Sequence, residues 1–402
     1  METAGGGSAA AAGAALGLKR PRGDDDDSTN SANSSDCDEW LVSDSGSEED
    51  DDDEIQGACC PFSVDEFPRV SFDHREQSRL PYRNPETKLR GPSPAMLFPP
   101  FKNDDHAFGS DYNLGDKSEI HMSNVGDCSG ECDCFPMLLL QFIDLKIAGY
   151  RHNRHGRAKI FGFFAARDTL EPLRNYVYRR DFDNCESVHV KRKTGVARLS
   201  LSSPTRVISM KIRAFIEFEF HVLNEDETNR DESSLIIEGC TELHTKWATN
   251  SFIKHVRLYG ERCALDIKYA VLIGAVEARV NIEVLTRAPT CTMDLKIYAK
   301  TSGFGDVIRL FRGTLPQVGY RNNFAVAVKR HSYLDLYMEG CREDDSALGN
   351  KLLPCSSWEH RFQSCFHGTL EDVVKLGDLA TISVTITWRS YEKRSVTAQI
   401  CK

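Results

Sequence analysis

Three cysteines close together are the sequence's clearest candidate for metal chemistry. Cys128-x3-Cys132-x-Cys134, with His121 upstream, could supply four zinc ligands, because thiolate and imidazole are groups that bind zinc in structural sites. The spacing is not that of paired C-x-x-C motifs, and the residues between the cysteines are mainly Gly, Asp and Ser. We therefore favour a flexible, thiol-bearing linker over a zinc site, and we predict no metal and no cofactor.

Two basic segments could bind an anion. One contains Arg151, Arg154 and Arg157, and the other is Lys191-Arg192-Lys193. Such side chains can contact phosphates or an acidic partner. The alternative, which we favour, is that both are ordinary polar hairpin loops. A further interpretation is intramolecular, with these loops receiving the protein's own acidic N-terminal segment.

Sequence motifs for catalysis are absent. The chain lacks G-x-S-x-G, H-E-x-x-H, a Walker-type phosphate loop and G-x-G-x-x-G. We interpret Arg167-Asp168 beside Arg174 as a corner ion pair that sets loop geometry and does no acid–base work. Catalytic residues can converge in space without a linear motif. We therefore leave an enzyme open, but lean towards a protein without catalytic activity.

The charge separates into two regions. The 402 residues contain 60 acids and 50 bases, a net charge of −10. Residues 1–60 hold 16 acids and three bases, whereas residues 61–402 carry a net charge of +3. Like charges and few apolar residues predict that residues 1–60 are a disordered acidic tail. Residues 61–135 are rich in proline, so we expect an extended strap or linker before a β-rich region at 136–402.

The acidic tail contains a candidate docking motif and candidate phosphorylation sites. Trp40-Leu41-Val42 is an apolar island among acids, and it is either a chance triplet or a short motif that docks a partner. Ser43, Ser45 and Ser47 precede Glu48-Glu49-Asp50, an arrangement that acid-directed kinases favour. No basic signal region or long apolar stretch is visible, and the 14 cysteines are irregularly spaced. We therefore expect a reduced intracellular protein, cytoplasmic or nuclear, that is not secreted and has no membrane partner.

From about residue 136 the pattern predicts short β-strands. In Phe215–Phe220, apolar and acidic residues alternate, so Ile216, Phe218 and Phe220 share one face and Glu217 and Glu219 the other. Val280–Val284 and Ile382–Trp388 alternate in the same way, and Gly274 is one of several glycines that mark expected breaks. Many short strands without a helical period predict an all-β, sandwich-like fold.

The strand order suggests an internal duplication. One series runs through 159–163, 173–177 and 215–220, and a second through 295–298, 307–311 and 333–337. Each series closes on a glycine-led strand, at 274–284 and 377–388. Two tandem β units at 136–288 and 289–402 would produce this order. The alternative is that alternating strands resemble one another by chance.

The β-rich region resembles a plant family, expanded in grasses, that is known as domain of unknown function 6598. The resemblance rests on Gln141–Ala148, Phe161–Asp168, Leu173–Tyr178, Ser203–Ser209 and Phe215–Phe220, and it spans residues 136–390. It implies no catalytic residue. Some grass relatives are similar to chains that also carry a ribosome-inactivating N-glycosidase domain. That enzyme needs a helical Glu-Ala-Ala-Arg run, whereas Glu277-Ala278-Arg279 lies in an expected strand.

Two functions remain as expectations. The first is a non-enzymatic protein-interaction module with an acidic disordered arm and an unnamed protein partner. The alternative is an RNA- or ribosome-directed stress or defence factor, which only the family association favours.

Overall fold

The computed structural model describes the greater part of the chain from residue 134 onwards and two short segments before it. The described ranges are 93–95, 116–121, 134–150, 157–191, 195–211, 213–223, 235–245, 249–260, 262–288, 293–342 and 356–393. They form β-strands joined by turns, with one 3-10 turn, η2 (Phe182–Asn184). The predicted all-β, sandwich-like class is confirmed. The predicted acidic tail, residues 1–60, lies outside the described residues.

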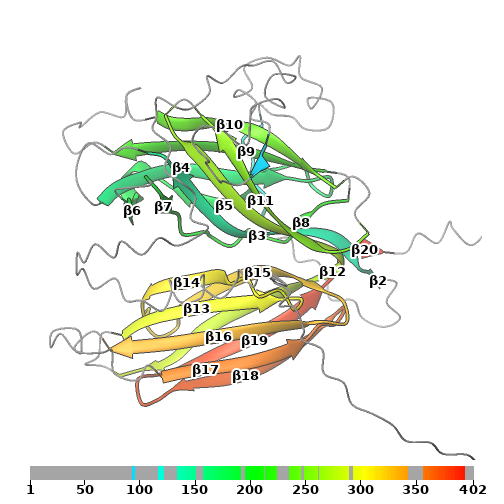
Figure 1. The fold of residues 1–402 in the computed structure, drawn as a ribbon. Coiled ribbons are helices and arrows are strands. Elements are labelled where there is room, and N and C mark those ends of the chain that lie inside the picture. Colours follow the sequence, from blue (N-terminus) through cyan, green and yellow to red (C-terminus); the bar gives the residue numbers. More distant parts are fainter. Residues whose placement is uncertain are drawn as a thin grey trace, which may run out of the picture. The chain divides into compact units, whose positions relative to one another are not determined.

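The strands fall into two successive sets (Figure 1). The first set is β3 (Met137–Ala148), β4 (Arg157–Arg167), β5 (Asn175–Arg180), β6 (Glu186–His189), β7 (Ala197–Arg198), β8 (Ile208–Ser209), β9 (Arg213–Leu223), β10 (Leu235–His244) and β11 (Phe252–Tyr259). The long β12 (Ala264–Arg287) follows. The second set is β13 (Met293–Thr301), β14 (Ile308–Thr314), β15 (Arg321–Lys329), β16 (Tyr333–Arg342), β17 (Ser356–Gln363), β18 (Gly368–Leu376) and β19 (Ala380–Arg389).

The two sets repeat one topology. One sheet of the first set has the order β10-β9-β4-β5, and the matching sheet of the second set has the order β17-β16-β13-β14. The facing sheet of the first set has the order β11-β12-β3, with β7 and β8 beyond β3. It matches the facing sheet of the second set, which has the order β18-β19-β12-β15. The correspondence pairs β4 with β13, β5 with β14 and β9 with β16. These are the strands that the sequence series proposed as equivalent, so the strand order supports two tandem units.

Strand β12 belongs to both units. Its first half pairs with β11 and β3, and its second half with β19 and β15. Gly274 was expected to break the chain into two strands, but β12 continues through it with φ +67° and a register shift between Leu272 and Ala275. Glycine adopts this left-handed conformation without steric cost, so the strand changes partners and does not end. The change of partners therefore falls near Gly274, ahead of the predicted division at 288/289, and 274–284 opens the second unit.

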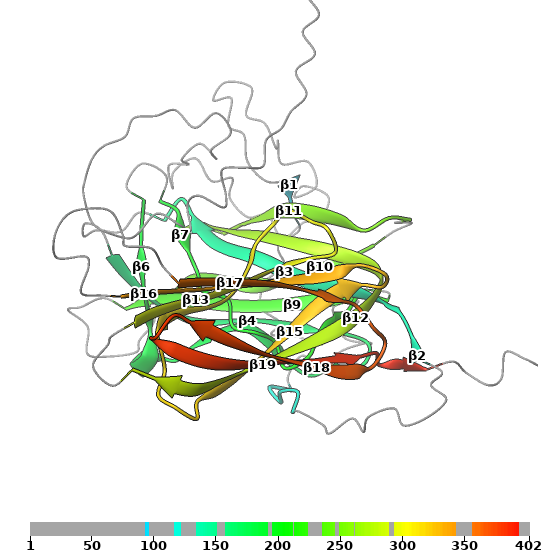
Figure 2. The ribbon, with the colours of Figure 1, turned by 90° about the horizontal axis from the view of Figure 1, so that it is seen from below.

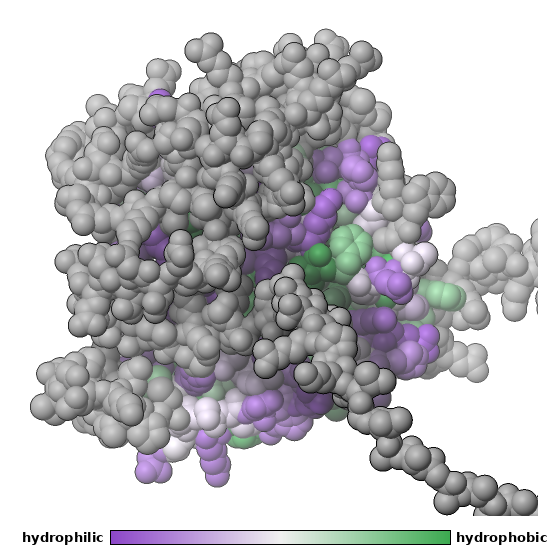
Figure 3. All heavy atoms as spheres, in the orientation of Figure 1, coloured by the Kyte–Doolittle hydropathy of each residue, from purple (hydrophilic) through white to green (hydrophobic). Residues whose placement is uncertain are grey.

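Each unit has its own apolar core. In the first, side chains of β3, β11 and the first half of β12 pack against β4, β9 and β10, with Phe142 and Phe164 in edge-to-face contact. In the second, the alternating strand β19 buries Ile382, Val384 and Ile386 against β13 and β16. The alternation predicted for β19 causes this common burial, because side chains two residues apart share a face. On the described part of the face in Figure 3, hydrophobic side chains occupy a smaller area than hydrophilic ones.

Strands β11, β17 and β18 had no counterpart in the sequence prediction. β17 and β18 are edge strands with mostly exposed side chains, so neither face carries a continuous apolar row. Period-2 patterning arises only where one face is buried, and it fades at an edge. β11 is interrupted by Lys254, His255 and Arg257.

Parts of the proline-rich region contact the β units. Strand β1 (Ser93–Pro94) pairs in parallel with β11, and the Ala95 N–H donates to the Arg257 carbonyl at 2.9 Å. Glu119 forms a parallel bridge with Arg174, next to β5. Strand β2 (Cys134–Phe135) pairs with β20 (Glu392–Lys393). The first unit therefore receives extended segments beside β11 and β5.

Candidate functional site

Most side chains predicted to bind a partner lie outside the described residues. These are Trp40, Leu41 and Val42, the serines 43, 45 and 47, and the basic residues Arg151, Arg154, Arg192 and Lys193. Of the predicted anion-binding set, Arg157 and Lys191 are described, and both are exposed. The Lys191 N–H donates to the Val196 carbonyl at 2.9 Å, immediately before β7. Of the two predicted basic segments, the structure thus describes one residue each.

Three cations converge on one carboxylate where the two units meet, and we call this group the Asp144 cluster. Lys146 Nζ lies 3.1 Å from Asp144 Oδ2, Arg198 Nε lies 3.1 Å from Oδ1, and Arg309 Nη1 lies 3.8 Å from Oδ1. These residues come from β3, β7 and β14. Burial raises the pKa of Asp144, but the three cations outweigh it and hold this pKa below its usual value.

A second ion pair adjoins the Asp144 cluster. Lys268 is the cross-strand partner of Asp144, and its ammonium group pairs with Asp306. Among these described residues, four cations thus face two carboxylates. All four cationic side chains remain partly exposed. The cluster therefore places four partly exposed cationic groups close together, and such groups can contact the anionic groups of another molecule.

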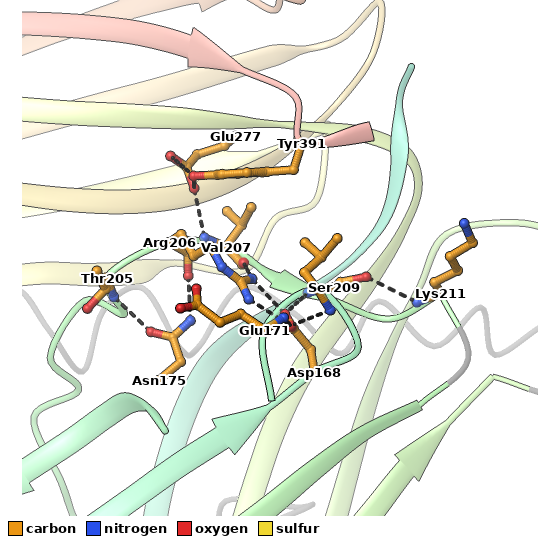
Figure 4. A network of polar contacts seen from close by, with 11 residues as sticks. Asp168, Glu171, Asn175, Thr205, Arg206, Val207, Ser209, Lys211, Glu277 and Tyr391 are labelled. Carbon is orange, nitrogen blue, oxygen red and sulfur yellow. Dashed lines mark hydrogen bonds and ion pairs between the residues drawn. The ribbon is translucent and has the colours of Figure 1, made fainter. Parts of the chain in front are cut away.

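A buried polar network connects the two units, and Figure 4 shows its members. Arg206 donates twice to Asp168, at 2.7 Å to each carboxylate oxygen, and the Ser209 N–H donates to Asp168 Oδ2 at 2.7 Å. Asp168 and Arg206 are 2% and 5% exposed. Bidentate pairs of this kind fix geometry strongly. The pair anchors the segment that contains Arg206 to the corner after β4.

The same segment is held from the second half of β12. The Val207 N–H donates to Glu277 Oε2 at 2.8 Å, and Tyr391 Oη donates to the Glu277 carboxylate at 3.0 Å. Arg279 Nη2 donates to the Thr205 carbonyl at 2.7 Å. Burial, followed by the Glu277 charge, raises the pKa of Tyr391, so this hydroxyl stays protonated and donates. The network therefore fastens one irregular segment to both units.

Arg167, Asp168 and Arg174 do not form the predicted corner pair. Arg167 Nε and Arg174 instead share Glu217 on β9, with Arg174 Nη2 at 2.6 Å from Glu217 Oε2. Asp168 pairs with Arg206, as described above. The prediction was wrong because it considered neighbours in sequence, whereas β4 brings Arg167 beside β9. The interpretation that these groups set geometry is consistent with the burial of Arg167 and Asp168 and with the ion pairs that all three groups form.

One cavity among the described residues is small. This cavity has a volume of about 20 Å³ and is lined by residues of both units, including Gln141, Ser203 and Arg309. Such a volume accommodates about one water molecule. It lies among residues of the segment that the buried network holds, and it is suited to a structural water.

The described cysteines and histidines form no cluster of metal ligands. Within the described ranges no three or more His, Cys, Asp or Glu side chains could hold a metal ion. Cys128 and Cys132, the core of the candidate zinc motif, lie outside these ranges. Cys134, Cys185, Cys240, Cys263 and Cys365 form no disulfide, whereas Cys341 is disulfide-bonded. Burial raises the pKa of the Cys240 and Cys263 thiols, so both are poor nucleophiles.

The comparison with protein families gives one match. A family described as a domain of unknown function, DUF6598, matches residues 139–386. The chain belongs to this family. The match covers both tandem units, so a DUF6598 domain here consists of the two sandwiches joined by β12. Three of the runs on which the resemblance rests, at 161–168, 173–178 and 203–209, supply Asp168, Asn175 and Arg206 to the buried network.

Other comparisons add likenesses of low similarity. A search of curated proteins found no match. Human GIVD cytosolic phospholipase A2 is 9% identical with a TM-score of 0.21, over 66% of the DUF6598 chain and 34% of the phospholipase. The DUF6598 chain thus spans about a third of the length of that enzyme. A pair of C2 domains, A and B, from extended-synaptotagmin 2 is 8% identical with a TM-score of 0.21, over 68% of this chain and 99% of that one.

The search for membrane-spanning helices was negative. Among the described residues, no helix has the length and apolar character needed to cross a bilayer.

Proposed function

We propose that this DUF6598 chain is a non-enzymatic protein-interaction module whose β-rich body binds an acidic segment of a partner protein. The observation that carries the proposal is the Asp144 cluster, in which Lys146, Arg198 and Arg309 share one carboxylate. An acidic segment could contact these partly exposed cationic groups, and complementary charge increases both association rate and specificity. Arg157, the first residue of β4, and Lys191, which precedes β7, are further exposed basic residues of the first unit.

Charge reversal in the Asp144 cluster tests this proposal. Arg309→Glu and Lys146→Glu are each expected to weaken binding of a labelled polyglutamate peptide by about tenfold or more at low salt, a change of about 1.4 kcal/mol. Fluorescence anisotropy measures the affinity. Arg321→Glu is the matched control, because Arg321 is an exposed arginine whose described partner is Glu283. Equal loss in the control, or no loss in the cluster variants of unchanged thermal stability, would refute the acidic-partner site.

The acidic N-terminal segment is part of the same proposal. Trp40-Leu41-Val42 serves as a docking motif for a second partner, and phosphorylation of Ser43, Ser45 or Ser47 deepens the surrounding negative charge. An intracellular location, cytoplasmic or nuclear, is consistent with these roles.

RNA binding is the second candidate, and one surface favours it. On the outer face of the β4–β5–β9 sheet, the Arg174 guanidinium lies 4.6 Å from the Phe163 ring centre and the Arg179 guanidinium lies 4.7 Å from that of Tyr176. Aromatic rings and guanidinium groups on a sheet are suited to stacking against unpaired bases. A plant stress or defence role, implied by the family resemblance, would belong to this candidate.

The RNA candidate predicts a specific effect of Tyr176. Tyr176→Ala should weaken binding of a single-stranded oligonucleotide about fivefold or more, since stacking of one base contributes roughly 1–3 kcal/mol. Electrophoretic mobility shifts at several salt concentrations measure it, with Tyr320→Ala, a partly exposed tyrosine of the second unit, as the control. Absent or salt-insensitive RNA binding would exclude this candidate.

A further inference from the structure

Strand β18 is an open edge with exposed apolar side chains. It pairs with β19 on one side, and it ends the order of its sheet. Val373, in the middle of the strand, is 52% exposed, and Leu370 is 44% exposed. Edges of this kind are templates for pairing with another strand, and proteins usually cover or charge them. Figures 1 and 2 both show β18 beside β19 at the margin of its sheet.

In the first unit, the edge strand that corresponds to β18 is paired with another segment of the chain. The strand that matches β18 in the first unit is β11, and β1 pairs with it in parallel through Ser93 and Pro94. The Arg257 carbonyl of β11 points outward and accepts the Ala95 N–H. Within the described ranges, no strand lies on β18 in the same way. The same architecture thus has its edge paired in one unit and open in the other.

The backbone of β18 is available for pairing at Val373. The Val373 N–H donates to its neighbour's carboxylate, Asp372 Oδ1, at 2.7 Å, so this N–H is directed away from β19. The other Asp372 oxygen lies 2.9 Å from His360 Nδ1 of β17. A strand arriving at the edge would replace the first contact by a backbone hydrogen bond and leave the second in place.

We propose that β18 pairs antiparallel with β18 of a second copy of this chain, about a two-fold axis at Val373. This register places Val373 against Val373, and it places Glu371 of each copy opposite Lys375 of the other. The three side chains share one face, because they alternate with the buried Val374 and Leu376. An isologous contact requires such self-complementarity, and opposite charges directly across a strand pair stabilise it.

The charged side chains of β18 indicate which segment pairs with this edge. Glu371 and Asp372 outweigh Lys375, and they repel the chain's own N-terminal residues 1–60, whose net charge is −13. A second copy meets the same edge with Lys375 aligned to Glu371. The pairing uses a surface of the second unit that is separate from the Asp144 cluster. A test of the pairing therefore does not depend on the proposed acidic partner.

Sedimentation equilibrium of the full chain, over a wide concentration range, tests the pairing. The average mass is expected to rise towards twice that of the chain. Glu371→Lys and Lys375→Glu each place like charges opposite one another twice, and each should raise the dimer dissociation constant at least about tenfold. An equimolar mixture of the two variants should regain dimers, because every Lys then faces a Glu. Lys254→Glu, an exposed charge on the matching strand β11, should leave the mass unchanged.

Three results would overturn the proposal. A mass that stays monomeric at all concentrations would show that the edge binds no second copy. Dimers that resist both single variants would place the contact elsewhere. Failure of the mixture to regain dimers, with both variants folded by circular dichroism, would exclude the antiparallel register at Val373.

Discussion

Replacing Asp168 with alanine is expected to lower the free energy of unfolding by about 3–5 kcal/mol, since removal of one partner leaves a buried charge uncompensated. Arg206 would lose both carboxylate contacts, and the Ser209 and Leu170 N–H groups would lose an acceptor. Urea denaturation followed by intrinsic fluorescence measures the change. The segment around Arg206 joins the two units, so we also expect a less cooperative transition.

Two further variants make the Asp168 result specific. Glu283→Ala removes an exposed ion pair with Arg321 at 3.0 Å, and it should cost less than about 1 kcal/mol. Asp168→Leu combined with Arg206→Met should recover part of the loss, because no unpaired charge remains buried. A destabilisation by Asp168→Ala no larger than that of Glu283→Ala would contradict the role assigned to the pair.

Gly162→Ala is expected to destabilise the first unit by about 2–5 kcal/mol, the combined cost of backbone strain and overpacking. Gly162 has φ +126°, and a Cβ atom there would lie 2.0 Å from the Glu219 carbonyl oxygen. That oxygen belongs to β9, the neighbour of β4 in the sheet, so it cannot move without disturbing strand pairing. Chemical denaturation of the variant measures the loss.

A matched glycine separates the two causes. Gly319 has φ +82°, and a Cβ atom there would meet nothing within 4 Å. Gly319→Ala should therefore show only the strain of the left-handed conformation, about 1–2 kcal/mol. Similar losses for Gly162→Ala and Gly319→Ala would show that the close approach of β4 and β9 has no energetic consequence.

Local sequence signals were sufficient for most of the strands but misleading for the charged groups. Glu217 was placed on the polar face of its strand, yet it is buried against Arg167 and Arg174. Asp144 and Glu277 stand within long apolar stretches of buried strands. An acid in such a stretch needs a partner, and this signal could have drawn attention to both.

The sequence alone determined the all-β class and most strand positions, because alternation and β-propensity are local properties. The duplicated strand series was only a hypothesis at that stage. The sequence also separated an acidic N-terminal region from a nearly neutral body. Only the tertiary structure decided that one strand, β12, serves both units, and that three cations meet at Asp144. Lys146, Arg198 and Arg309 are brought together by pairing and packing of β3, β7 and β14. Contacts between residues so far apart in the chain depend on strand register, which no local pattern specifies.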